Sequence, residues 1–109
     1  MPETLPKGLT LRGLEVFETL ARTGSVAETA ERLGLSAPAV SQQLRNLSLT
    51  LGVELVDHSR RPMVLTPAGR LFLERAETAL QALRAGQRGI AMLDLADLSA
   101  LSLGMIEDF

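Results

Sequence analysis

Residues 27–47 read AETAERLGLSAPAVSQQLRNL, and this stretch decides the fold of the chain. Ser25, just before it, is a good N-cap for a short first helix. The apolar residues expected to face inward from that helix are Val26, Ala30 and Leu33. Residues 34–36, Gly-Leu-Ser, then supply a tight turn and the cap of a second helix. The stretch therefore predicts two short helices, the second spanning residues 37–47 and extending by about one turn to Gly52.

The second helix has one apolar and one polar face. With about 100° between successive helical residues, four apolar residues fall within about 40° of one line, namely Val40, Leu44, Leu47 and Leu51. The opposite side carries hydroxyl and amide groups, one arginine and no carboxylate; its residues are Pro38, Ser41, Gln42, Arg45 and Asn46. Such a surface suits base edges flanked by phosphates. We interpret the pair as a helix-turn-helix that reads DNA, and the alternative is an ordinary solvated face.

A scaffold helix is predicted ahead of this pair. Thr10 is placed to cap it, and Thr23 and Gly24 are placed to end it. Its apolar residues recur at spacings of three and four and are Leu14, Phe17, Leu20 and Ala21. A single aromatic residue at helical spacing is typical of a core, so Phe17 is expected to pack rather than to bind a ligand.

A small hairpin is predicted after Gly52. Two β-prone stretches, residues 53–57 and 63–65, flank the sequence Ser-Arg-Arg-Pro. A hairpin that follows a helix-turn-helix is a wing. Arg60 and Arg61 at its tip are placed to contact phosphates or a narrow minor groove, and the alternative is an ordinary solvated turn.

A long helix is predicted from Thr66 and Pro67, a hydroxyl cap followed by a first-turn proline. Its residues at alternating spacings of three and four form a seam: Leu73, Ala76, Leu80, Leu83, Gln87 and Ile90. We expect the seam to pair with a second copy of the chain; the alternative is that the helix lies on its own domain. Gly86 and Gly89 are expected to loosen its far end.

The predicted organisation has four segments. Residues 1–10 hold three proline or glycine residues and no apolar run, which predicts a flexible arm, neither a signal peptide nor a membrane span. Residues 11–65 are the winged helix-turn-helix, and residues 66–93 the dimerisation helix. Residues 94–109 are interpreted as a hinge and the opening strand of a truncated second domain, because small residues alternate there with Leu101, Leu103 and Met105.

Composition excludes several classes of protein. The 109 residues include no cysteine and one histidine, so neither a thiol site nor a metal cluster is expected, and a reducing cytoplasm fits. Glu74 and Glu77 lie one turn apart without a nucleophile or base, so no enzyme, cofactor or metal site is predicted. The net charge of −2 argues against nucleic acid, but residues 32–70 hold five arginines against two acidic residues.

With these residues assembled, the chain from Leu11 to Gly104 resembles the N-terminal part of a LysR-type transcriptional regulator. The matching residues of the three helices are Leu14, Phe17, Leu20, Gly24-Ser25-Val26, Ala30, Leu33, Ser36, Pro38, Ala39, Ser41 and Gln43. Those of the wing and the following helix are Leu51-Gly52-Val53, Leu55, Arg61, Leu65-Thr66 and Ala68-Gly69. Each match is weak alone, but the ordered set is specific.

The resemblance implies a mainly α, winged helix-turn-helix fold whose long helix pairs antiparallel with its mate. It implies that the homodimer reads an interrupted inverted repeat in double-stranded DNA, and that a missing C-terminal domain binds a small-molecule effector and permits higher oligomers. Residues expected near bases are Ala37, Pro38, Ser41 and Gln42. Residues expected near phosphates are Ser25, Ser36 and Arg45, while Arg61 is expected to reach the minor groove.

Three positions depart from the family pattern. Ala37 stands where glutamine is common, Gln42 where arginine is common, and His58 where arginine is usual. The first two remove base-reading groups, so binding is expected to depend more on DNA shape. The simpler interpretation of His58 is a surface histidine, and the alternative is a pH switch. The departures, with the net acidity, also favour a different hypothesis, a winged-helix module that binds proteins and has lost DNA binding.

Overall fold

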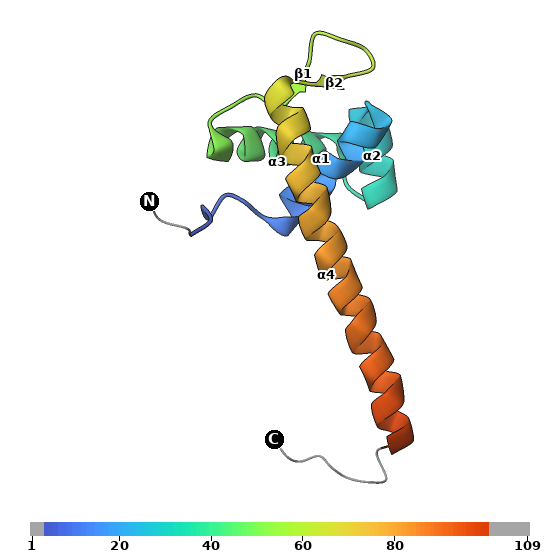
Figure 1. Cartoon of the computed structure of the whole chain (residues 1–109). Coiled ribbons are helices and arrows are strands. Elements are labelled where there is room, and N and C mark those ends of the chain that lie inside the picture. The colour runs from blue at the N-terminus through green and yellow to red at the C-terminus, as the bar shows by residue number, and fades with distance from the viewer. Residues whose placement is uncertain (1–3, 101–109) are drawn as a thin grey trace.

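The computed structural model describes residues 4–100, with side chains up to Asp94. Its elements are α1 (Leu11–Thr23), α2 (Val26–Leu33), α3 (Ala37–Leu51), β1 (Val56–Asp57), β2 (Val64–Leu65) and α4 (Pro67–Ala100). Figure 1 shows a body of three helices and a hairpin at one end of α4, whose remaining length projects away from it. The predicted mainly α, winged helix-turn-helix followed by a long helix is therefore confirmed.

Short-range signals set the limits of the first three helices. The side-chain oxygens of Thr10, Ser25 and Ser36 each accept a hydrogen bond from the backbone N–H three residues on, at 3.0–3.2 Å. The three helices end at glycines with φ of 68°, 67° and 72°, a region that side chains disfavour. All six signals were readable in the sequence.

The core lies around α1, which packs against α2, α3 and α4. Phe17 is completely buried, and its ring lies 6.0 Å from that of Phe72, centroid to centroid. Val40, Leu44 and Leu47 of α3 are buried as predicted, while Leu51 is half-buried. Val26 and Leu33, which were expected inside, are only half-buried and pack at the edge of the core.

The hairpin strands are shorter than predicted, with two residues each. Val56 pairs with Leu65 and Asp57 with Val64 in antiparallel register. The backbone N–H of Met63 donates to the carbonyl of Gly24 instead of to β1, at 3.1 Å. This bond ends the ladder early and ties the hairpin to the α1–α2 turn.

Helix α4 differs from its prediction in two respects. It continues without a break through Gly86 and Gly89 to Ala100, past the expected end at residue 93. Each glycine costs only about 1 kcal/mol relative to alanine, and its neighbours are mostly good helix formers. The strand expected at residues 101–109 lies outside the described residues.

The predicted dimer seam is also divided. Ala76 and Leu80 are 3% and 4% exposed and pack in the chain's own core, where Leu73 is half-buried. These three residues pack within the chain itself, as in the alternative of a helix lying on its own domain. Leu83, Gln87 and Ile90 are exposed.

Candidate DNA-binding surface

The outward face of α3 is the centre of the candidate surface. Because Val40 and Leu47 are anchored in the core, Pro38, Gln42 and Arg45 point away from it and are exposed. Ser41 is half-buried at the edge of this face. The first turn of α3 contains no acidic residue. The structure therefore brings the predicted base-reading residues to one side of one helix, as expected.

The polar side chains on this face are joined by hydrogen bonds. Arg45 Nη1 donates to Gln42 Oε1 at 3.1 Å, and Gln42 Nε2 donates to Asn46 Oδ1 at 2.9 Å. Both bonds are exposed to solvent, so exchanging them for bonds to DNA costs little. An amide side chain suits the donor and acceptor pair on adenine, and an arginine suits guanine or a phosphate.

The start of α3 has the chemistry of an anion site. Ser36 caps the helix, and Ala37 and Pro38 in its first turn are exposed and small. Free backbone N–H groups and the positive end of the helix dipole favour phosphate at such an end. Ser25 occupies the equivalent position in α2, but it is half-buried and Glu28 lies in the first turn of that helix.

The hairpin tip is folded onto itself. Arg61 Nη1 donates to the carbonyls of His58 and Arg60, at 2.7 and 2.9 Å. Arg60 Nε lies 3.7 Å from Asp57 Oδ2. Both arginines are exposed, but Arg61 does not extend outward as the minor-groove prediction implies. Its two bonds use a single nitrogen of a group with five N–H donors, so the folded-back side chain can still donate to a phosphate.

Asp57 shapes the turn between the strands. Its Oδ1 accepts from the backbone N–H of Ser59 at 2.9 Å and from the Ser59 hydroxyl at 2.6 Å. These hydrogen bonds, helped by the charge of Arg60, hold the pKa of the Asp57 carboxyl below its ordinary value. The carboxylate therefore stays ionised at neutral pH and offsets part of the positive charge at the tip.

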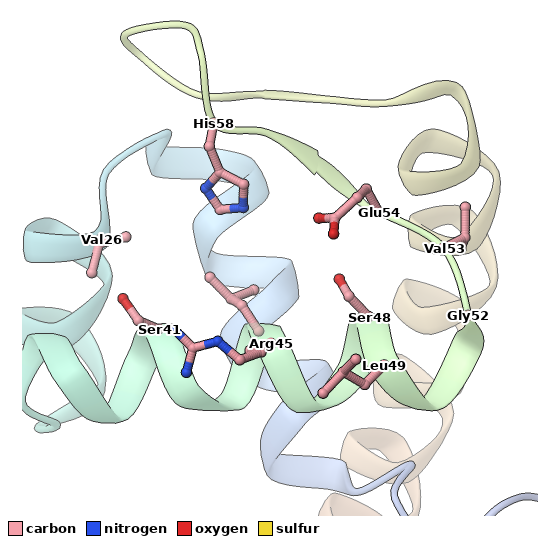
Figure 2. A pocket seen from close by; sticks show the side chains of 10 residues that line it. Val26, Ser41, Arg45, Ser48, Leu49, Gly52, Val53, Glu54 and His58 are labelled. Carbon is pink, nitrogen blue, oxygen red and sulfur yellow. The ribbon is translucent and has the colours of Figure 1, made fainter.

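A groove of about 670 Å³ separates α3 from the hairpin. In Figure 2 the His58 ring hangs from the hairpin toward α3, and the Glu54 carboxylate points toward Ser48. Leu49 closes the lower edge and is 72% exposed. Sequence reasoning missed Leu49 and Glu54, although the 100° arithmetic places Leu49 opposite Val40. A carboxylate and several apolar side chains thus line part of this groove.

Within the described part of the chain, no three histidine or acidic side chains come together in a way that fits a metal ion. None of the helices there is both long and apolar enough to cross a membrane.

Comparison with known proteins identifies the family. Residues 11–70 match the family model described as bacterial regulatory helix-turn-helix protein, lysR family. The transcriptional activator CmpR of Synechocystis is 40% identical over 87 residues, which are 80% of this chain and 29% of CmpR. The chain thus spans less than a third of that relative's length.

Solved structures agree with the sequence comparison. DarR of Vibrio fischeri, in complex with DNA, is 35% identical with a TM-score of 0.73, covering 81% of this chain and 30% of DarR. The BenM DNA-binding domain, in complex with benA site 1 DNA, is 27% identical with a TM-score of 0.68, covering 81% of this chain and 99% of that domain. The family consists of transcriptional regulators and not of enzymes. This chain belongs to the lysR family of bacterial regulatory helix-turn-helix proteins, and comprises its winged DNA-binding domain with the long helix that follows.

Proposed function

We propose that this chain binds a specific inverted-repeat promoter site as a homodimer, with α3 in the major groove of each half-site. The observation that carries the proposal is the outward face of α3, which is mostly polar apart from Leu49 and free of carboxylates, while its other face is locked in the core. In helix-turn-helix proteins the second helix of the pair occupies the major groove.

The proposal gives each part of the surface a role. Ala37, Pro38, Ser41 and Gln42 approach base edges, and Ser25, Ser36 and Arg45 lie near phosphates. Arg60 and Arg61 contact the backbone or the minor groove from the hairpin. Since Glu54 and Asp57 reduce the local positive charge, non-specific binding is expected to be weak and the salt dependence of affinity moderate.

The dimer contact is assigned to the projecting part of α4. Leu83 and Ile90 are 52% and 62% exposed, and Leu93 is 62% exposed. At spacings of seven and three these residues lie on one side of the helix, with Gln87 between them. Apolar side chains along a helix that has left its domain are typical of a contact with another helix.

DNA binding is tested with a fragment selected from a random library by the purified protein. Gln42→Ala and Arg45→Ala are each expected to lower the affinity about five- to a hundredfold, the cost of one lost base or phosphate contact. Gln81→Ala is the matched control, an exposed glutamine on α4. Equal affinity for selected and scrambled DNA, or no effect of either α3 substitution, would contradict the proposal. A flat salt response would instead favour the protein-binding module.

Dimerisation is tested by sedimentation at micromolar concentration. A Leu83→Asp, Ile90→Asp variant is expected to be a monomer, because two charges would lie in an apolar contact. Leu71→Asp is the control, since Leu71 is 70% exposed and lies off that side of the helix. A monomeric unchanged protein would remove the dimer from the proposal and leave DNA binding by one subunit.

The family resemblance supports two further parts of the proposal. The regulator acts in the cytoplasm, where its DNA lies, and responds to a small-molecule effector bound outside these 109 residues. Both parts concern a whole regulator of the relatives' length. The matched region covers only 29% of CmpR and 30% of DarR.

A further inference from the structure

A buried carboxylate links the DNA-reading body to α4. Glu18 of α1 is 2% exposed. Arg84 Nη2 donates to its Oε1 at 2.9 Å and Arg84 Nη1 to its Oε2 at 3.4 Å, a two-point arrangement. Arg22, one turn further along α1, also donates to Oε2, at 3.4 Å. Both oxygens of the carboxylate are therefore occupied.

The Glu18–Arg84 ion pair differs from the others in the separation of its two residues along the sequence. Every other ion pair among residues 4–94 joins positions three or four apart and only supports a local turn. Glu18 and Arg84 are 66 positions apart and belong to different helices. The hydrogen bond to Glu18, more than their opposite charge, raises the pKa of the Arg84 guanidinium above its ordinary value. The Arg84 guanidinium is thus charged at any physiological pH.

Arg84 stands where α4 leaves the body. Leu80, one turn earlier, is 4% exposed, and residues 85–94 are all exposed. Apolar contacts before Arg84 hold α4 against α1 but are not directional. A two-point guanidinium–carboxylate bond is directional, and it acts at the last position before the helix becomes free.

Small changes of direction at this point have large consequences. Sixteen residues from Arg84 to Ala100 span about 24 Å at about 1.5 Å per residue. A tilt of about 10° at Arg84 would move the far end by about 4 Å, comparable to the rise of about 3.4 Å per base pair. Glu18 belongs to α1, and α1 also packs against α3, the proposed recognition helix. The ion pair therefore connects the direction of α4 to the recognition helix through α1.

We propose that Glu18 and Arg84 act as a clamp that sets the direction of the free part of α4, and thereby the spacing between the two recognition helices of the dimer. They are positioning residues, and neither contacts DNA. The effect on spacing rests on the proposed dimeric DNA binding. The effect on the direction of α4 does not, so each has its own experiment.

The first experiment measures the direction of α4 within one chain. The protein has no cysteine, so Glu31→Cys on α2 and Arg88→Cys on α4, both exposed, allow two spin labels to be placed. Labelled protein is diluted into an excess of unlabelled protein, and the label-to-label distance is measured by pulsed electron resonance. Arg84→Gln is expected to broaden or shift the distance distribution, and Arg84→Lys to restore it in part because one bond to Glu18 remains.

The controls separate a clamp from general stability. Arg75→Gln changes another exposed arginine of α4, which forms no ion pair within residues 4–94, and is expected to leave the distribution unchanged. Arg84 is preferred to Glu18 as the test site because its side chain is 36% exposed, so its variants should still fold. An unchanged distribution in a folded Arg84→Gln protein would overturn the clamp.

The second experiment uses operators whose half-site spacing increases by single base pairs. The unchanged protein is expected to prefer one spacing about tenfold, the scale of one poorly matched base pair, and Arg84→Gln to reduce this preference below about threefold. Affinity for an isolated half-site should not change. An equal loss of affinity at every spacing and at the half-site would overturn the role in spacing. Absence of binding by the unchanged protein would overturn the proposed function, while the distance result would still stand.

Discussion

The two parts of α4 have the same sequence pattern and opposite surroundings. In the packed part, residues 67–84, most of the apolar positions at spacings of three and four pack in the chain's own core, and Ala76 and Leu80 are almost fully buried. In the free part, residues 85–94, the pattern continues, but Ile90, Met92 and Leu93 are 62–67% exposed. Periodicity therefore identifies the apolar face of a helix, but it does not identify the element or molecule against which that face packs.

The largest effect should come from comparing two leucines of the packed part, one buried and one exposed. Leu80→Ala is expected to lower the free energy of unfolding by about 2–5 kcal/mol, because it leaves a cavity under a fully packed side chain. Leu83→Ala, three residues away and 52% exposed, should change it by less than about 0.5 kcal/mol. Urea unfolding at a concentration low enough to exclude dimers measures both. Similar losses would show that the core also covers Leu83.

The two parts of α4 also differ in how much room surrounds their glycines, and Gly69 of the packed part has none. A Cβ at Gly69 would collide with the backbone carbonyl of Leu55, which leads into the hairpin. Backbone cannot move aside as a side chain does, so Gly69→Ala is expected to destabilise the fold by about 1–3 kcal/mol. Leu71→Ala, two positions along α4 and 70% exposed, is the control for altering this turn. Thermal unfolding monitored by circular dichroism provides the measurement, and an unchanged midpoint would mean that the hairpin is loosely attached.

Much of the fold was predictable because its signals are short-range. Ser36 and Gly52 bound α3, and the spacing of Val40, Leu44 and Leu47 fixes its inward side without knowledge of the partner. The outward positions of Gln42 and Arg45 follow by the same arithmetic. Their assignment to DNA contacts remains a prediction, since it depends on a molecule that the sequence does not contain.

The features that were missed depend on distant contacts. Glu18 falls within the apolar stripe of α1, between Leu14 and Ala21, which indicates a buried carboxylate that needs a cation. Nothing local distinguishes Arg84 from the other arginines of α4 as that cation. The hairpin is shorter than predicted for the same reason, because Met63 bonds to Gly24, nearly forty residues earlier in the chain.

The smallest expected effect has the opposite sign and belongs to the free part. Nothing lies within 4 Å of a Cβ placed at Gly89, and its helical backbone is one that alanine adopts readily. Gly89→Ala is therefore expected to stabilise this part of α4 by up to about 1 kcal/mol, by reducing the freedom of the unfolded chain. Amide hydrogen exchange of residues 86–93 should slow about two- to fivefold.

Gly86→Ala sharpens this last prediction, because Gly86 is equally open within one chain but lies on the same side of α4 as Leu83 and Ile90. In a monomer the two alanine variants should slow exchange alike. If two α4 helices pack closely at Gly86, its added methyl group weakens the dimer, and sedimentation will distinguish it from Gly89→Ala. Equal dimer affinity of the two variants would mean that the helices do not approach closely there, which would move the dimer contact away from this side of α4.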